Sequence, residues 1–112
     1  MMSFLDWRNG PAQRLLREAM GFDISQISSW EEYTQTFVYV VNRGGGHAVV
    51  EKMRDTFGSM SSGEQLLFAA CICAGDYSWL SDELMEDRTW RRIWFNLSDN
   101  YRISVAAAIA RI

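Results

Sequence analysis

One histidine, His47, is the side chain best suited to proton transfer near neutral pH, and it directly follows Gly44-Gly45-Gly46. The glycine run lacks the Lys-Ser/Thr pair of a phosphate-binding loop and the spacing of a dinucleotide-binding fingerprint. No second catalytic group stands at motif spacing from His47, so we expect an ordinary surface histidine after a helix-to-helix connection. An enzyme whose site residues come from distant positions stays an open alternative, because catalytic triads assemble in that way.

Two cysteines, Cys71 and Cys73, are the next candidates for chemistry. They lie in the apolar run Leu66–Ala74, and side chains two residues apart on a helix point to different sides. We therefore expect buried thiols, no metal site and no cofactor. Free thiols indicate a reducing compartment, and residues 1–9 show no signal-peptide pattern, so we expect a cytoplasmic protein. The apolar run is also too short for a membrane span, which needs about 20 residues.

Four carboxylates cluster late in the chain, at Asp82, Glu83, Glu86 and Asp87. Two carboxylates can act as acid and base where they flank a bond in a cleft, and clustering along the sequence does not establish that arrangement. The simplest interpretation is a solvated helix face. The alternative is an acidic patch that binds a basic partner.

Arginines and aromatic residues follow the acidic cluster and together could form a binding surface. On a helix, four of them share one side: Arg88, Arg91, Arg92 and Phe95. Exposed arginine and aromatic side chains are enriched where proteins bind proteins, so we expect this face to bind a protein partner. In a second interpretation, the arginine stems cover core aromatics and pair with the nearby carboxylates.

The same arginines, together with Arg102, could instead bind nucleic acid, because arginine and aromatic side chains are used against single strands. The formal net charge of −3 disfavours this alternative, since nucleic-acid-binding domains usually carry a basic excess. Lys52 is the only lysine among the 11 basic residues, a bias that a GC-rich genome would also produce. A small nucleic-acid-binding regulator is therefore our alternative function.

Hydrophobic periodicity predicts helices for the elements that would carry these groups. After Pro11, apolar residues recur at helical spacing up to Met20, and Gly21 is a natural helix end. A further helix is predicted from His47 to Phe57, with its charged residues facing water.

The segment 33–50 allows two interpretations. Ser29-Trp30-Glu31-Glu32 has the pattern of a capping box, and apolar residues follow at helical spacing. The segment is also rich in Thr, aromatic and β-branched residues, which favour strands, and the glycines could turn it into a β-hairpin. We favour the helix because the cap and the spacing agree.

The run Leu66–Ala74 is apolar on nearly every side, and a helix without a polar face must be buried on every side. Ser61 and Glu64 offer a capping box before it. We therefore predict that this is the central helix of the fold. Three short helices should follow it, with caps at Asp76, Thr89 and Ser98.

These elements predict an all-α fold, a compact bundle of about five to seven helices around the central helix 66–74, in a single domain over residues 1–112. Some of the large aromatic side chains should lie at the surface, and clustered exposure among them would mark an interface: Phe4, Trp7, Trp30, Trp79, Trp90 and Trp94. We expect a non-enzymatic protein that binds another protein, as an adaptor, inhibitor or immunity-type factor, or that self-associates as a homodimer. In size and composition, the chain is similar to many small phage, mobile-element and bacterial proteins.

Overall fold

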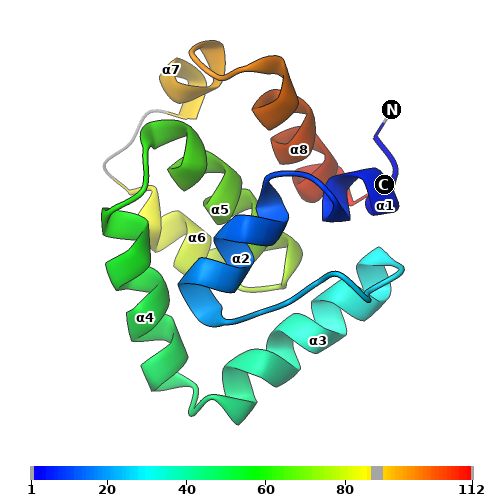
Figure 1. Cartoon of the computed structure of the whole chain (residues 1–112). Helices are drawn as coiled ribbons and strands as arrows, with labels where there is room; N and C mark the ends of the chain where they lie inside the picture. The colour runs from blue at the N-terminus through cyan, green and yellow to red at the C-terminus, as the bar shows by residue number, and fades with distance from the viewer. Residues whose placement is uncertain (1, 87–89, 112) are drawn as a thin grey trace.

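The structure, a computed structural model, describes residues 2–86 and 90–111, and these residues form eight α-helices without a strand (Figure 1). The helices are α1 (Phe4–Arg8), α2 (Ala12–Met20), α3 (Trp30–Arg43), α4 (His47–Gly58), α5 (Ser62–Ala74), α6 (Ser78–Leu84), α7 (Trp90–Phe95) and α8 (Asp99–Ala110). The all-α prediction is confirmed. The number of helices exceeds the predicted five to seven because the five-residue helix α1 was not anticipated.

Helix α5 lies at the centre, as its apolar sequence predicts. Every side chain from Gln65 to Ile72 is buried, and α2, α6, α7 and α8 all pack against this helix. The expected capping box fixes its start: Ser61 N donates to Glu64 Oε1 over 2.9 Å, and Glu64 N donates to Ser61 Oγ over 3.3 Å. These bonds satisfy backbone donors that a helix start leaves without intrahelical partners.

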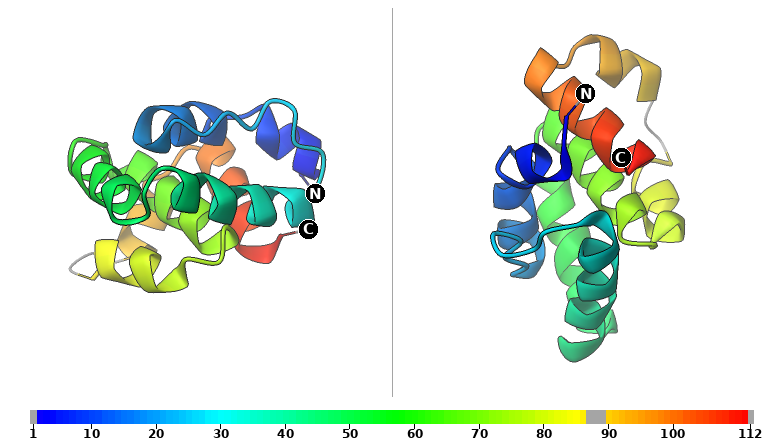
Figure 2. Two further views of the ribbon diagram at one scale, coloured as in Figure 1. Left: turned by 90° about the horizontal axis from the view of Figure 1, so that it is seen from below. Right: turned by 90° about the vertical axis from the view of Figure 1, so that its right-hand side faces the viewer.

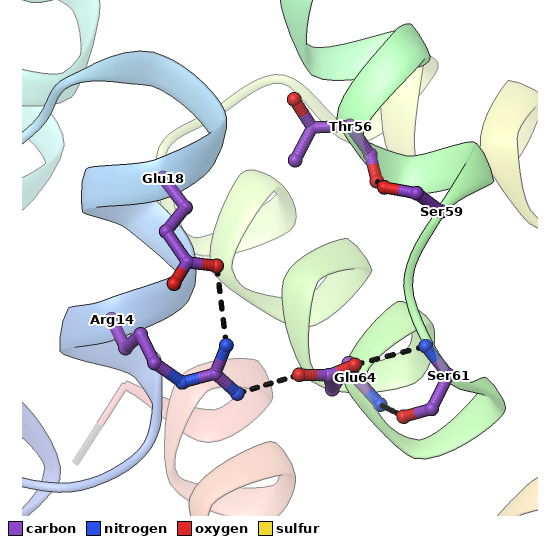
Figure 3. A network of polar contacts seen from close by, with 6 residues as sticks. All are labelled: Arg14, Glu18, Thr56, Ser59, Ser61 and Glu64. Carbon is purple, nitrogen blue, oxygen red and sulfur yellow. Dashed lines mark hydrogen bonds and ion pairs between the residues drawn. The ribbon is translucent and has the colours of Figure 1, made fainter.

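A polar network links α2 to the start of α5 (Figure 3). The Arg14 guanidinium donates to Glu18 over 3.1 Å and to Glu64 over 2.5 Å. The hydrogen bond from Arg14, assisted by the Ser61 backbone N–H, lowers the pKa of the Glu64 carboxyl. Glu64 therefore serves both the cap of α5 and the contact between α5 and α2.

Residues 33–43 and 47–50 are helical and residues 44–46 form the turn between them, so the β-hairpin alternative is not adopted. Ser29 Oγ accepts a hydrogen bond from Glu32 N over 3.2 Å at the start of α3, and the apolar stripe of this helix is buried. The turn into α4 places Gly45 and Gly46 at φ angles of 91° and 52°, which side chains with a Cβ rarely adopt. The glycines thus connect two helices.

Aromatic rings form one continuous series of contacts through the core, with neighbouring centroids 4.5–6.3 Å apart. In order of contact they are Phe4, Trp7, Trp30, Tyr33, Phe22, Phe37, Tyr77 and Trp79. The expected split of the aromatics between interior and surface is confirmed for the described side chains. Phe4 and Trp7 are buried, Trp30 and Trp94 are half-buried, and Trp79 is exposed.

The predicted cap at Asp76 is wrong. Helix α6 begins after Tyr77 without a side-chain hydrogen bond at its N-cap. Asp76 belongs to the turn that ends α5, where its backbone N–H donates to Cys73 O over 3.1 Å and its φ angle is 67°. Its carboxylate faces Arg111 Nη1 at 3.4 Å instead.

The other two expected caps have different outcomes. Thr89 lies outside the described residues, whereas Ser98 Oγ accepts from Tyr101 N over 3.5 Å and caps α8 as predicted. None of the described helices combines the length and apolar character that a membrane span requires.

Candidate protein-interaction surface

Helices α7 and α8 follow one another along one edge of the molecule, and α8 lies on the side that faces the viewer in the right-hand view of Figure 2. Arg102, in the first turn of α8, joins the two helices. Its Nε donates to Trp94 O over 3.0 Å, and its Nη2 donates to Phe95 O over 2.8 Å. These carbonyls lie at the end of α7, where Trp94 O also accepts from Leu97 N over 3.2 Å, and the two bonds from Arg102 fix α7 relative to α8.

The inner side of α8 is small and tightly packed. Ser104, Val105, Ala107 and Ala108 are buried, and α8 packs against α5 and α1. The buried Trp7 donates from Nε1 to Ser104 O over 3.1 Å, which holds α1 against the middle of α8. Small side chains at a helix contact allow the two axes to approach closely.

The opposite side of α8 is exposed and nevertheless apolar. We define the α8 outer face as Ile103, Ala106, Ile109 and Ala110, all of which are exposed. Ile103 and Ile109 are 49% and 54% exposed. No charged residue occurs between Arg102 and Arg111, so two turns of an exposed helix carry only aliphatic groups at their surface. Phe95, at the end of α7, is 62% exposed, and its main-chain carbonyl accepts a hydrogen bond from Arg102, the residue before Ile103.

An open groove of about 570 Å³ meets the α8 outer face at Ala110. Its remaining lining comes from the end of α8 and the first turns of α3: Arg111, Trp30, Glu31, Thr34 and Gln35. Arg111 contacts Thr34 Oγ1 at 3.5 Å and Asp76 Oδ1 at 3.4 Å. The apolar α8 outer face therefore ends in a polar region.

The structure brings part of the sequence-predicted binding face to the surface. Arg92 and Phe95 are both exposed on α7, three residues apart. Arg88 lies outside the described residues. For Arg91, the structure describes the backbone, which belongs to α7, and not the side chain. Arg102, the additional arginine of the nucleic-acid hypothesis, donates its guanidinium hydrogen bonds to main-chain carbonyls of α7.

The α8 outer face was not predicted from the sequence. The available signal was the absence of any charged residue from 103 to 110, although an exposed helix normally carries a polar face. An element that is apolar on both sides is either buried all round or has one side available to a partner.

The other candidates for chemistry remain apart from one another. His47 is exposed at the first residue of α4, and the described residues contain no group of three or more metal-ligating side chains. Burial raises the pKa of the Cys71 thiol, and the buried Tyr33 hydroxyl donates to Cys71 O over 2.7 Å. Both groups belong to the core.

The carboxylate cluster lies largely in solvent, as its simplest interpretation holds. Asp82, Glu83 and Glu86 are exposed, and Asp87 lies outside the described residues. Glu83 accepts two hydrogen bonds from Arg54, at 2.8 and 3.0 Å, and this pairing lowers the pKa of its carboxyl. Glu83 therefore serves the contact between α6 and α4.

No protein-family model matches the chain, and no curated protein and no solved structure shows significant similarity to it.

Proposed function

We propose that this chain is a non-enzymatic protein that acts by binding another protein through the α8 outer face, with Phe95 and Arg92 of α7 at its margin. The observation that supports this proposal is that the α8 outer face is exposed within an uncharged stretch from residue 103 to 110. Single exposed apolar residues are normal on any protein, whereas several on one face of one helix mark an interaction site.

The groups on this surface suit binding. Aliphatic side chains contribute apolar area on association, and an adjacent aromatic ring and guanidinium group are the residue types enriched at binding hot spots. The proposal keeps the cytoplasm as the compartment, because Cys71 and Cys73 are both free thiols and free thiols persist under reducing conditions.

An affinity capture with matched variants tests the proposal. Ile103→Glu and Ile109→Glu place a charge on the α8 outer face, and Tyr39→Glu places one on an exposed position of α3. We expect the unmodified chain and Tyr39→Glu to retain the same stoichiometric protein after nuclease treatment, and the two isoleucine variants to lose it.

Equal capture by all four proteins would contradict the proposal, provided that thermal melts show all of them folded. A bound fraction that disappears with nuclease would instead support the nucleic-acid-binding regulator.

A further inference from the structure

The α8 outer face is symmetric about Ala106. Ile103 lies three residues before Ala106, and Ile109 lies three residues after it. A step of three residues on an α-helix turns the side chain about 60° short of a full turn. The two isoleucines therefore lie on opposite sides of the line through Ala106, one toward each end of the helix.

We infer that the partner of this surface is a second copy of the chain, bound with the two α8 helices antiparallel around a two-fold axis at Ala106. The inference rests on the proposed function, because it names the occupant of the same surface. A two-fold interface requires a patch that is complementary to itself, and a face with the same large residue on each side of a central alanine meets this requirement.

On one edge of the paired helices, the antiparallel register brings a large side chain against a small one. When the two Ala106 residues face each other, Ile103 of one chain lies level with Ile109 of the other chain. Ile103 therefore lies between the levels of Ala106 and Ala110 of that other chain. Ile103 and the opposing Ala110 lie on the same edge of the paired helices, so the isoleucine fills the space left by the alanine. The central alanines allow the helix axes to approach to about 8 Å.

The charges at the ends of α8 distinguish antiparallel from parallel pairing. Asp99 begins the helix with a side chain that is 94% exposed, and Arg111 follows its end. Antiparallel pairing places the opposing Arg111 between the levels of Asp99 and Arg102, which form an ion pair at 3.8 Å within each copy, so each Arg111 meets a neutral pair. Parallel pairing would set like charges beside each other, and it would also align the two helix dipoles unfavourably.

Phe95 adds apolar area at one edge of the pair. Its carbonyl accepts a hydrogen bond from Arg102, and Arg102 lies on the same edge of α8 as Ile109. The opposing Ile109 is level with Ile103, one residue beyond Arg102. One helix face with such a margin is smaller than the standard interface of about 1,600 Å², so we expect a dimer with micromolar affinity.

Sedimentation velocity across a concentration series tests self-association of the full chain. We expect a reversible shift from monomer to dimer for the unmodified protein and for Tyr39→Glu. Ile103→Glu and Ile109→Glu should weaken the dimer at least about tenfold, because each replaces apolar area in the contact with a carboxylate that the contact desolvates. A protein that stays monomeric up to millimolar concentration would overturn the inference, as would a dimer of unchanged affinity in the two isoleucine variants.

A cysteine at the proposed axis tests the arrangement independently. In a Cys73→Ser background, Ala106→Cys should form an intermolecular disulfide under mild oxidation, because the two positions face each other across the axis. Tyr39→Cys in the same background is the control and should crosslink much less. Equal crosslinking of the two variants would exclude the axis at Ala106.

The two proposals fail in different ways. If the chain is monomeric but the isoleucine variants lose a different captured protein, the α8 outer face binds a partner and only the dimer is excluded. If the variants change neither self-association nor capture, both proposals fall.

Discussion

The ring of Phe37 lies directly over Gly75, so that a Cβ atom added at Gly75 would come within 2.5 Å of Phe37 Cγ. This contact packs the middle of α3 against the end of α5. Gly75→Ala should therefore force the buried ring to move and should lower the free energy of unfolding by about 1–3 kcal/mol. Urea denaturation measures the difference. Gly58→Ala is the matched control, because no atom lies within 4 Å of that Cβ position, and it should leave stability unchanged or slightly raised.

The hydrogen bond from Trp7 to Ser104 O gives a second prediction. Trp7→Phe removes the indole N–H, so the buried Ser104 carbonyl loses this hydrogen bond, and the smaller ring leaves a small cavity. The substitution should therefore lower the free energy of unfolding by about 2 kcal/mol. Trp79→Phe alters an exposed ring and should change stability by less than about 0.5 kcal/mol. Thermal unfolding followed by circular dichroism compares the two variants, and equal effects would mean that Trp7 contributes nothing specific to the α1–α8 contact.

The ion pair between Arg14 and Glu64 predicts a pH-dependent contribution to stability. The pKa of Glu64 is lowered in the folded state, so its contribution is present above the unfolded pKa of about 4.3 and is lost as the pH falls through the lower folded value. Glu64→Gln should cost about 0.5 kcal/mol at pH 7 and nearly nothing at about pH 2. Glu86→Gln at the surface is the control. A constant difference across the pH range would show that the charge of Glu64 has no role.

Thiol reactivity is a further observable. Cys71 is fully buried, and its raised pKa disfavours the reactive thiolate, whereas Cys73 is half-buried. Iodoacetamide should therefore modify Cys73 first in the native protein and should reach Cys71 only in denaturant. Mass spectrometry of a labelling time course distinguishes the two sites, and equal native rates would show that the core around α5 opens readily.

The longer helices α2, α3 and α4 could be predicted from the sequence because each carries an apolar stripe that shows its period, and α5 could be predicted because it is apolar on nearly every side. Helix α1 has only five residues, too few for a period, and its available signal was local: Asp6 N donates to Ser3 Oγ over 3.1 Å. Whether Asp76 caps α6 could not be predicted from the sequence, because an aspartate caps the helix that follows it only if its own backbone is extended. That backbone conformation depends on how α5 ends.

The candidate surface was only partly predictable. The sequence places Arg92 and Phe95 on one side of a helix, and the structure shows both exposed. Which side of α8 is covered depends instead on the packing of α5 and α1 against Ser104 and its neighbours, and these contacts join distant parts of the chain. Both sides of α8 are apolar, so its hydrophobic pattern alone could not distinguish the inner side from the outer one.

The bond between Trp7 and Ser104 spans 97 positions of the sequence, and this separation affects how the protein is made. Synthesis begins at the N-terminus, so α1 leaves the ribosome long before its acceptor on α8 exists. Until α8 emerges, the Trp7 indole lacks this hydrogen-bond partner and the core remains incomplete. We therefore expect ribosome-bound chains that end before α8 to be digested rapidly by protease, and the α1–α8 contact to be among the last to form.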